Sequence, residues 1–140
     1  MKLSSKGRYA LMALADLANF DPNEPVSLRD ISLRQGISLV YLEQLFLKLK
    51  KNKIVNSVRG NKGGYTLNKK ASEINISEVF LAVDEKIKTV GCEKHSKKGC
   101  NGKSTKCITH NLWDELEDYI NVFFEKKKLS DLINTKDSRI

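Results

Sequence analysis

The sequence predicts a mostly α-helical fold with one small β-hairpin, arranged as a winged helix-turn-helix that is followed by a long C-terminal helix. Two short helical patterns meet at a glycine-centred turn near residue 36, and an alternating β-branched segment with a glycine-rich centre comes next. A strong apolar stripe then runs over about residues 111–127. At 140 residues the chain suits one domain, or one small domain with an appendage.

The first helix is expected over residues 6–20, and the segment DPNEP at 21–25 should end it. Asp16 and Asn19 fall off its apolar stripe, so we expect them on the polar side. The apolar positions of this stripe are Tyr9, Ala10, Leu14, Leu17 and Ala18.

The helix-turn-helix is expected over about residues 28–51. Ser27 can cap its first helix, with Leu28 and Ile31 facing inward, and Gly36 should end that helix after about two turns. Ser38 can cap the second, longer helix. The apolar residues of this second helix, Leu42, Leu45, Phe46 and Leu49, follow the spacing i, i+3, i+4 and i+7.

A β-hairpin and two further helices complete the pattern. The segment IVNSVRGNKGGYTL alternates around glycines, which predicts a hairpin with Arg59 and Lys62 at its tip. The next helix contains Ile76, Val79, Phe80 and Val83, and Ser77 is its expected cap. After an irregular Gly-, Lys- and Ser-rich segment comes the long helix over about residues 111–127. A final turn at 129–133 and a frayed tail follow it.

The net charge of +8 and the pI of about 9.4 suggest a polyanionic partner, with nucleic acid as the first candidate. A lysine-rich proteome would produce the same charge, so charge alone does not decide. No stretch is apolar enough to span a membrane, and the N-terminus lacks a signal-peptide pattern, so we expect a cytoplasmic protein with reduced thiols. Paired carboxylates, a nucleophile elbow and a phosphate-binding loop are missing, which argues against an enzyme.

The second helix of the helix-turn-helix would present polar side chains to DNA. Gln44 can pair with adenine, Ser38, Tyr41 and Lys48 can bond to phosphate or sugar, and Arg59 can enter a narrow minor groove. Glu43 would repel phosphate, although its carboxylate can accept a hydrogen bond from the cytosine amino group or weaken binding to other DNA sequences. Amphipathic helix pairs are common, so the hairpin and the charge are needed to support this interpretation. The expected DNA-binding residues are Leu28, Ser38, Val40, Tyr41, Glu43, Gln44, Lys48, Lys51, Arg59, Gly60 and Lys62.

Residues 91–110, GCEKHSKKGCNGKSTKCITH, hold every cysteine and histidine of the chain. The spacing Cys92-x7-Cys100-x6-Cys107-x2-His110 indicates a metal site, because clustered thiols in a reducing compartment favour metal or redox chemistry. Zinc bound by three cysteines and one histidine, an iron–sulfur cluster and a thiol redox switch all remain open from spacing alone. His95 is a spare imidazole and is more simply explained as solvated.

Several segments resemble the Rrf-type bacterial repressors. The winged-helix segment RDISLRQGISLVYLEQLFLKLKKNKIVNSVRGNKGGYTL carries the family resemblance. The segments ISEVFLAVDE and CITHNLWDEL are most similar to the members of that family that are regulated by an iron–sulfur cluster. The resemblance runs from about residue 1 to residue 133. It implies four parts: a DNA-binding domain at 1–84, a cluster-binding loop at 85–110, a dimerisation helix with a terminal turn at 111–133, and a flexible tail at 134–140.

The resemblance also implies a homodimer that binds a palindrome-like operator in double-stranded DNA and represses cluster-assembly genes. A 2Fe–2S cluster would sit on Cys92, Cys100, Cys107 and His110, and the cluster-free form would bind a second class of DNA site. The cysteine spacing here is longer than the family's usual pattern, which puts the type of cluster in question. Relatives that sense nitric oxide or iron often carry a 4Fe–4S cluster with a different fourth ligand, but the segment CITH favours the histidine-ligated group.

Overall fold

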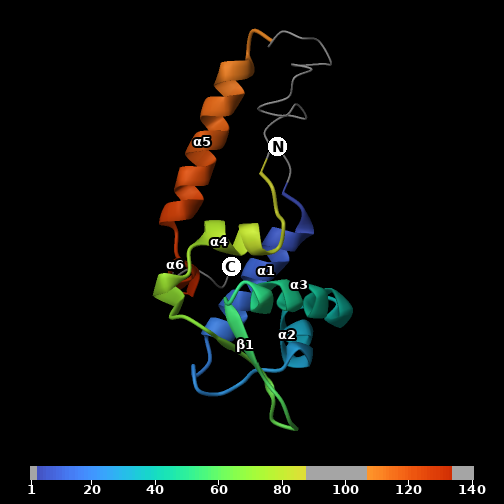
Figure 1. Cartoon of the computed structure of the whole chain (residues 1–140). Helices are drawn as coiled ribbons and strands as arrows, with labels where there is room; N and C mark the ends of the chain where they lie inside the picture. The colour runs from blue at the N-terminus through green and yellow to red at the C-terminus, as the bar shows by residue number, and fades with distance from the viewer. Residues whose placement is uncertain (1–2, 88–106, 134–140) are drawn as a thin grey trace.

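The computed structural model describes residues 3–87 and 107–133 (Figure 1). Within these ranges a compact head of helices and a hairpin carries one helix, α5, that projects away from it (Figure 1). The elements are α1 (Ser5–Ala18), α2 (Leu28–Gln35), α3 (Leu39–Lys51), β1 (Val55–Val58), β2 (Gly64–Leu67), η1 (Ala71–Glu73), α4 (Ile76–Ala82), α5 (His110–Lys126) and α6 (Leu129–Ile133). The predicted order of helices around one hairpin is confirmed.

The helix-turn-helix begins and ends where the caps predict. The Ser27 side chain accepts a hydrogen bond from the Asp30 N–H, and the Ser38 side chain accepts one from the Tyr41 N–H, so each serine satisfies a free donor of a first turn. Gly36 ends α2 at φ 67°, a left-handed conformation that glycine adopts without steric cost.

Strands β1 and β2 form the antiparallel wing, with Val55 opposite Leu67 and Val58 opposite Gly64. Val26, just before α2, adds a bridge to Tyr65, so the wing is tied to the entrance of the helix-turn-helix. Gly64 makes this approach possible, because a Cβ there would lie 2.3 Å from the Val26 carbonyl oxygen. The wing is therefore anchored at its base and free at its tip.

The core of the head is built from the apolar stripes of α1, α2, α3 and α4. Its largest fully buried side chains include Leu14, Ile31, Phe46 and Val79. The chain returns to this core after α5, because Ile76 N–H bonds to the Lys127 carbonyl and Leu129 is completely buried. Helix α6 therefore packs with the head, although the sequence grouped it with the long helix.

Two local expectations need correction. Helix α4 is capped by Asn75, not by Ser77: the Asn75 side chain accepts from the Glu78 N–H while the Glu78 carboxylate accepts from the Asn75 N–H. Asp16, expected on the polar side of α1, is only 5% exposed. The tail at 134–140 lies outside the described residues. No helix in the described part of the chain has the length and apolar character needed to cross a membrane.

Candidate DNA interface and cluster site

One face of α3 is open to solvent along its whole length. Glu43, Gln44 and Lys51 are exposed on it, and they alternate with two apolar side chains, Val40 at 63% and Leu47 at 65% exposure. These positions recur every three or four residues, so they form a single stripe opposite the buried one. Such a face can read base edges through Gln44 and contact thymine methyl groups through its apolar members.

Leu47 is a member of this stripe that the sequence reasoning missed. It lies seven residues after Val40 and three after Gln44, so helical spacing could have found it. An apolar residue in an amphipathic helix is normally assigned to the core, and for that reason Leu47 was not included among the expected DNA-binding residues. Its exposure shows that the outward face of α3 is wider and less polar than expected.

Two residues expected to contact phosphate lie instead on an edge of α3 that faces other helices. The Tyr41 hydroxyl lies 2.9 Å from the Ser5 hydroxyl of α1, and the Tyr41 ring packs edge-on against Tyr9 at 5.8 Å. The Lys48 ammonium donates to the Asp84 carboxylate just after α4, at 3.0 Å. Lys48 lowers the pKa of Asp84, through this hydrogen bond first and its charge second. Both side chains are therefore already engaged in the protein itself.

Leu28 does not belong among the side chains that contact DNA. It is 8% exposed and packs in the core beneath α2. The first residues of α2 can approach DNA only through the backbone or through exposed neighbours such as Arg29. Ser38 remains exposed at the start of α3, although its hydroxyl already caps that helix.

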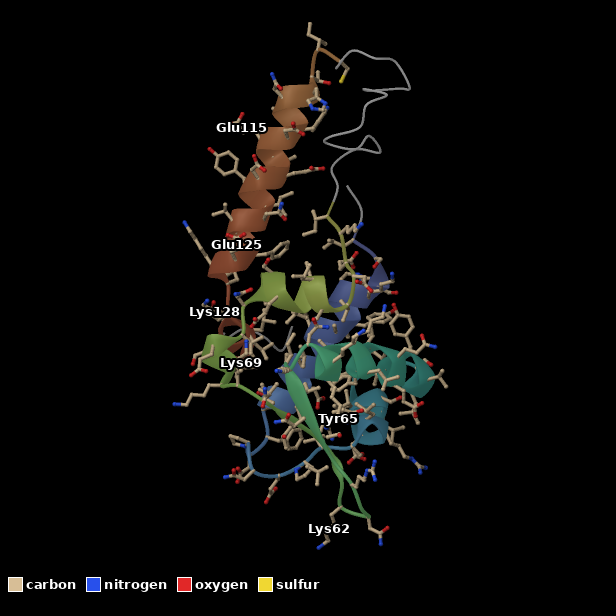
Figure 2. The ribbon with its side chains drawn as sticks, viewed as in Figure 1. Lys62, Tyr65, Lys69, Glu115, Glu125 and Lys128 are labelled. Atoms are coloured by element: carbon tan, nitrogen blue, oxygen red, sulfur yellow. The ribbon has the colours of Figure 1, made fainter. Side chains whose placement is uncertain are left out.

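The wing tip has the expected form. Arg59, Gly60, Asn61 and Lys62 are all exposed, and Figure 2 shows Lys62 at the far end of the hairpin. Gly60 has φ 115° and accepts a hydrogen bond from the Gly63 N–H, which closes a tight turn. The turn thus presents Arg59 and Lys62 away from the head, where a groove or a phosphate could meet them.

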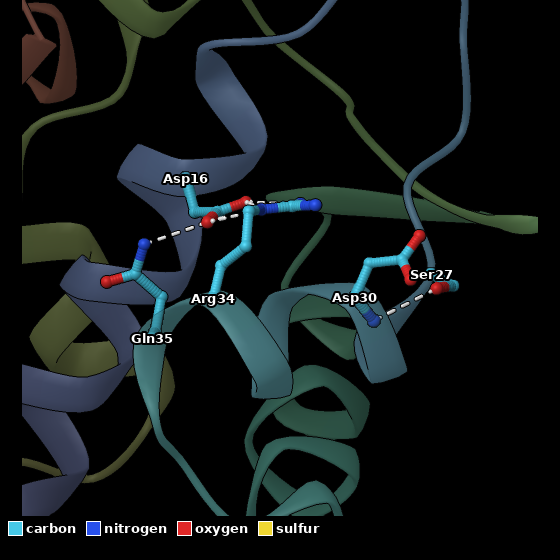
Figure 3. Close-up of polar contacts among 5 residues, drawn as sticks. All are labelled: Asp16, Ser27, Asp30, Arg34 and Gln35. Atoms are coloured by element: carbon cyan, nitrogen blue, oxygen red, sulfur yellow. Dashed lines mark hydrogen bonds and ion pairs between the residues drawn. The ribbon is translucent and has the colours of Figure 1, made fainter.

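An ion pair between the buried Asp16 and the partly exposed Arg34 joins α1 to α2 of the helix-turn-helix (Figure 3). The Asp16 carboxylate accepts from Arg34 Nη2 at 2.8 Å and Nε at 3.0 Å, and from Gln35 Nε2 at 2.8 Å. These bonds raise the pKa of Arg34, with the hydrogen bond to Asp16 as the largest cause. They also explain why a carboxylate can be buried in α1, since every buried charge needs partners. The pair sets the position of α2 relative to α1.

The described part of the expected metal site is a turn at the start of α5. The His110 N–H donates to the Cys107 carbonyl at 3.1 Å, so the two expected ligands share one turn, although only His110 lies within α5. Cys107 is half-buried, with Sγ 3.6 Å from Thr109 Oγ1. The imidazole of His110 is 5% exposed, and its Nε2 lies 3.1 Å from Asp114 Oδ2.

The donor chemistry of this turn suits iron. Thiolate sulfur and imidazole nitrogen are both iron ligands, and a ligating histidine commonly bonds to a carboxylate through its other ring nitrogen, the role that Asp114 can fill. Cys92, Cys100 and His95 lie outside the described residues. Within residues 3–87 and 107–133, no group of three potential metal ligands comes together.

Helix α5 exposes a large apolar face. Its members are Leu112, Leu116, Tyr119, Val122 and Phe123, with exposures of 40–69%. The C-terminal end of α5 is partly covered, because Phe124 packs against Phe80 of α4 at 5.0 Å. Figure 2 shows Glu115 and Glu125 spread along the part of α5 that leaves the head. Exposed apolar patches of this kind mark interaction surfaces.

Comparison with known proteins agrees with this geometry. Residues 3–135 match the Rrf2 family, described as an iron-dependent transcriptional regulator. The chain is 50% identical over 137 residues to the HTH-type transcriptional regulator IscR of Photorhabdus laumondii, covering 98% of this chain and 82% of the relative. It is 49% identical, with the same coverage, to the IscR protein of Yersinia pestis.

Solved structures show the same fold over nearly the whole chain. The structure of T. potens IscR matches with a TM-score of 0.76 and 30% identity, over 100% of this chain and 92% of that one. The structure of CymR, the global cysteine regulator of B. subtilis, matches with a TM-score of 0.79 and 28% identity, over 98% and 99% of the two chains. With an open recognition face on α3 and a basic wing tip, this chain belongs to the Rrf2 family and is a DNA-binding transcriptional regulator of that type.

Proposed function

We propose that this regulator is a homodimer that holds an iron–sulfur cluster, of the 2Fe–2S type, and that the cluster controls its binding to palindrome-like operators of cluster-assembly genes. The observation that carries the proposal is the turn in which Cys107 and the buried His110 are joined directly to the start of α5. Relatives at 49–50% identity over 98% of the chain bear the name IscR, which supports the same conclusion. A regulator of this kind acts in the cytoplasm.

Cys92, Cys100, Cys107 and His110 would hold the cluster. When bound, the cluster supplies a redox-active and oxygen-sensitive centre, so its presence can report on the supply of iron and sulfide. The protein's own part would be to orient the ligands: Asp114 Oδ2, 3.1 Å from His110 Nε2, would position the ring, and the hydrogen-bonded turn keeps Cys107 beside it. The 4Fe–4S and structural zinc alternatives use the same residues and differ in metal content.

Oxygen-free purification tests the cofactor directly. We expect a coloured protein with two iron and two sulfide ions per chain for a 2Fe–2S cluster. Bound zinc without sulfide would refute the proposed sensor. Four iron and four sulfide ions per chain would show a 4Fe–4S cluster instead. Cys107→Ala should lose the cluster, whereas Ile108→Ala is a matched control because that neighbouring side chain is fully exposed. His110→Cys should keep a cluster with a lower reduction potential, because imidazole ligands raise that potential relative to thiolates.

In the DNA complex, the outward stripe of α3 would lie in the major groove. Gln44 would read adenine, Val40 would contact thymine methyl groups, and Glu43 would accept from cytosine or exclude other bases. Lys51 and the wing residues Arg59, Gly60 and Lys62 would approach the backbone and the minor groove. Since Leu28 is buried and Tyr41 and Lys48 are already engaged, we assign no base contact to their side chains.

Salt dependence tests these contacts. If Arg59 and Lys51 touch phosphates, Arg59→Gln and Lys51→Gln should each reduce the slope of log affinity against log salt by about 1.8, which is about 0.9 for each subunit of the dimer. Arg59→Ala should also weaken binding most at operators with a narrow minor groove. An unchanged slope in both variants would remove these two residues from the interface.

A second copy of the chain is the partner we propose for the apolar face of α5. Two α5 helices packed along Leu116, Tyr119 and Phe123 would cover side chains that α4 leaves open. The two-fold axis would then place the two α3 helices about 34 Å apart, one turn of DNA. Sedimentation should show a dimer that Tyr119→Glu dissociates, whereas Glu125→Gln on the same helix leaves it intact. A wild-type monomer at micromolar concentration would refute the assembly.

A further inference from the structure

Two acidic residues at the end of α4 hold two helices of the DNA-binding head at once. Asp84 accepts the Lys48 ammonium of α3 at 3.0 Å. Its neighbour Glu85 accepts three hydrogen bonds at the start of α1: from Ser4 Oγ at 2.7 Å, from Gly7 N–H at 2.9 Å and from Ser4 N–H at 3.3 Å. We call this pair, Asp84 and Glu85, the acidic corner.

The contact with α1 is closely fitted. The first N–H groups of a helix have no partner within it, and they favour negative charge, so the Glu85 carboxylate satisfies both needs at once. A Cβ added at Gly7 would lie 2.8 Å from the Phe80 ring and 2.9 Å from Glu85 Cγ. Glycine at this position thus lets α1 approach the acidic corner.

The backbone of the corner is also unusual. Asp84 has φ 60°, a left-handed conformation that non-glycine residues adopt at a cost and that the surroundings must hold in place. Asp84 itself accepts from Lys48, and the next residue, Glu85, accepts from the start of α1. The corner therefore contacts both helices, α1 through the hydrogen bonds of Glu85 and α3 through the exposed ion pair of Asp84 with Lys48.

The edge of α3 that contacts the acidic corner also contacts α1 directly. Tyr41, seven residues before Lys48 and on the same edge, meets Ser5 of α1 at 2.9 Å. The start of α1 and the corner thus hold both halves of α3, and the opposite, outward face stays open for DNA. Figure 1 shows the end of α4 beside the start of α1, with α3 beneath them.

The corner lies between the head and the segment that carries the cysteines. Two residues later, Ile87 lines a groove with Tyr119, Ile120, Phe123 and Phe124 of α5. The chain then continues into the segment that contains Cys92 and Cys100. In the sequence, Asp84 and Glu85 are thus placed between the helices of the head and this segment, and Ile87 sets the chain that follows them beside α5.

We infer that Asp84 and Glu85 are positioning residues through which the cysteine-bearing segment sets the placement of α1 and α3 on DNA, and that Lys48 acts through Asp84 rather than on a phosphate. The first half of this inference rests on the proposed cluster control. The second half concerns the cluster-free protein as well and stands on the geometry of the head alone.

Operator affinity of the cluster-loaded and cluster-free dimers tests the first half. Allosteric coupling typically changes affinity by about 5- to 150-fold. We expect such a ratio in the wild-type protein and a ratio below about twofold in both Asp84→Asn and Glu85→Gln. Glu125→Gln, which makes the same change of charge on α5, should keep the wild-type ratio. Asp84 is exposed, so its variant should fold normally even if Glu85→Gln destabilises α1.

The outcomes distinguish failure of the positioning role from failure of cluster control. A wild-type ratio that persists unchanged in both corner variants overturns the inference and leaves cluster control standing. Equal affinity of the loaded and cluster-free wild-type dimers refutes cluster control itself, and the first half of the inference fails with it.

The salt slope of the cluster-free dimer tests the second half. A phosphate contact contributes about 0.9 to that slope, so Lys48→Gln should weaken specific binding with the slope unchanged, as Asp84→Asn does. Hydrogen exchange should then rise over α3 in both variants. A loss of about 1.8 from the slope in Lys48→Gln, about 0.9 for each subunit, would show that Lys48 binds phosphate and would overturn its positioning role.

Discussion

Replacing Arg34 by alanine should destabilise the head more than replacing its partner Asp16 by asparagine. The Asp16 side chain is 4% exposed, whereas the Arg34 side chain is 39% exposed. Removal of Arg34 leaves a buried carboxylate with the Gln35 amide as its remaining partner among the bonds of Figure 3. Removal of the Asp16 charge leaves a guanidinium that water can still reach.

The expected magnitudes follow from this difference in exposure. Breaking a buried pair so that an uncompensated charge remains costs about 3–5 kcal/mol. Loss of a hydrogen bond to a charged group costs about 1.5–3 kcal/mol when the charge can be hydrated. Arg34 also stacks over the Phe20 ring at 4.6 Å, which adds about 0.5–1 kcal/mol to its removal. We therefore expect about 4 kcal/mol for Arg34→Ala and about 2 kcal/mol for Asp16→Asn.

Urea unfolding of the reduced, cluster-free protein measures both values, at one fixed protein concentration because dimerisation contributes to stability. Arg29→Ala is the matched control, since Arg29 is exposed on the same helix, and it should change the free energy of unfolding by less than about 0.5 kcal/mol. Equal losses for the two variants, or a larger loss for Asp16→Asn, would refute the argument that the buried partner determines the cost.

Three further changes probe other parts of the head. Gly64→Ala should cost about 1–3 kcal/mol and weaken DNA binding, because φ is 157° there and a Cβ would collide with the neighbouring carbonyl; wild-type affinity would contradict this. Asn75→Ala should lower the free energy of unfolding by about 1 kcal/mol, with Ser77→Ala nearly neutral, and the reverse order would restore Ser77 as the cap of α4. Leu129→Ala should cost about 2–5 kcal/mol in the same urea assay because this side chain is completely buried, and a loss below 1 kcal/mol would show that α6 adds little to the head.

Most of the fold was predictable because it depends on local signals. Apolar spacing located α1 to α5, serine caps located the starts of α2 and α3, and glycines located the wing turn. The cap of α4 was wrong by two residues, since Asn75 and Ser77 both precede or begin an apolar run and only the backbone geometry distinguishes them. Local chemistry narrows a helix start to a few residues, and packing selects one of them.

The candidate site was predictable only in part. Helical spacing placed Gln44 and Lys51 on the open face of α3 and Leu28 on the buried side, as the structure has them, but Leu28 was still included among the DNA-binding residues and Leu47 was overlooked. Spacing reports which residues share a face. It does not report which neighbouring element covers an edge of that face, and that determines whether a side chain such as Tyr41 is available to DNA.

By itself the sequence determined the winged helix-turn-helix, the long helix α5 and the grouping of every cysteine and histidine in residues 92–110, up to the first residue of that helix. Each of these depends on residues a few positions apart. The tertiary structure alone decided that Asp16 is buried by Arg34, 18 residues away, that Asp84 holds Lys48 across 36 residues, and that Glu85 caps α1 across 81 residues. The physical reason is that a charged side chain accepts whichever partner the fold brings within hydrogen-bond distance, and periodicity carries no information about that partner.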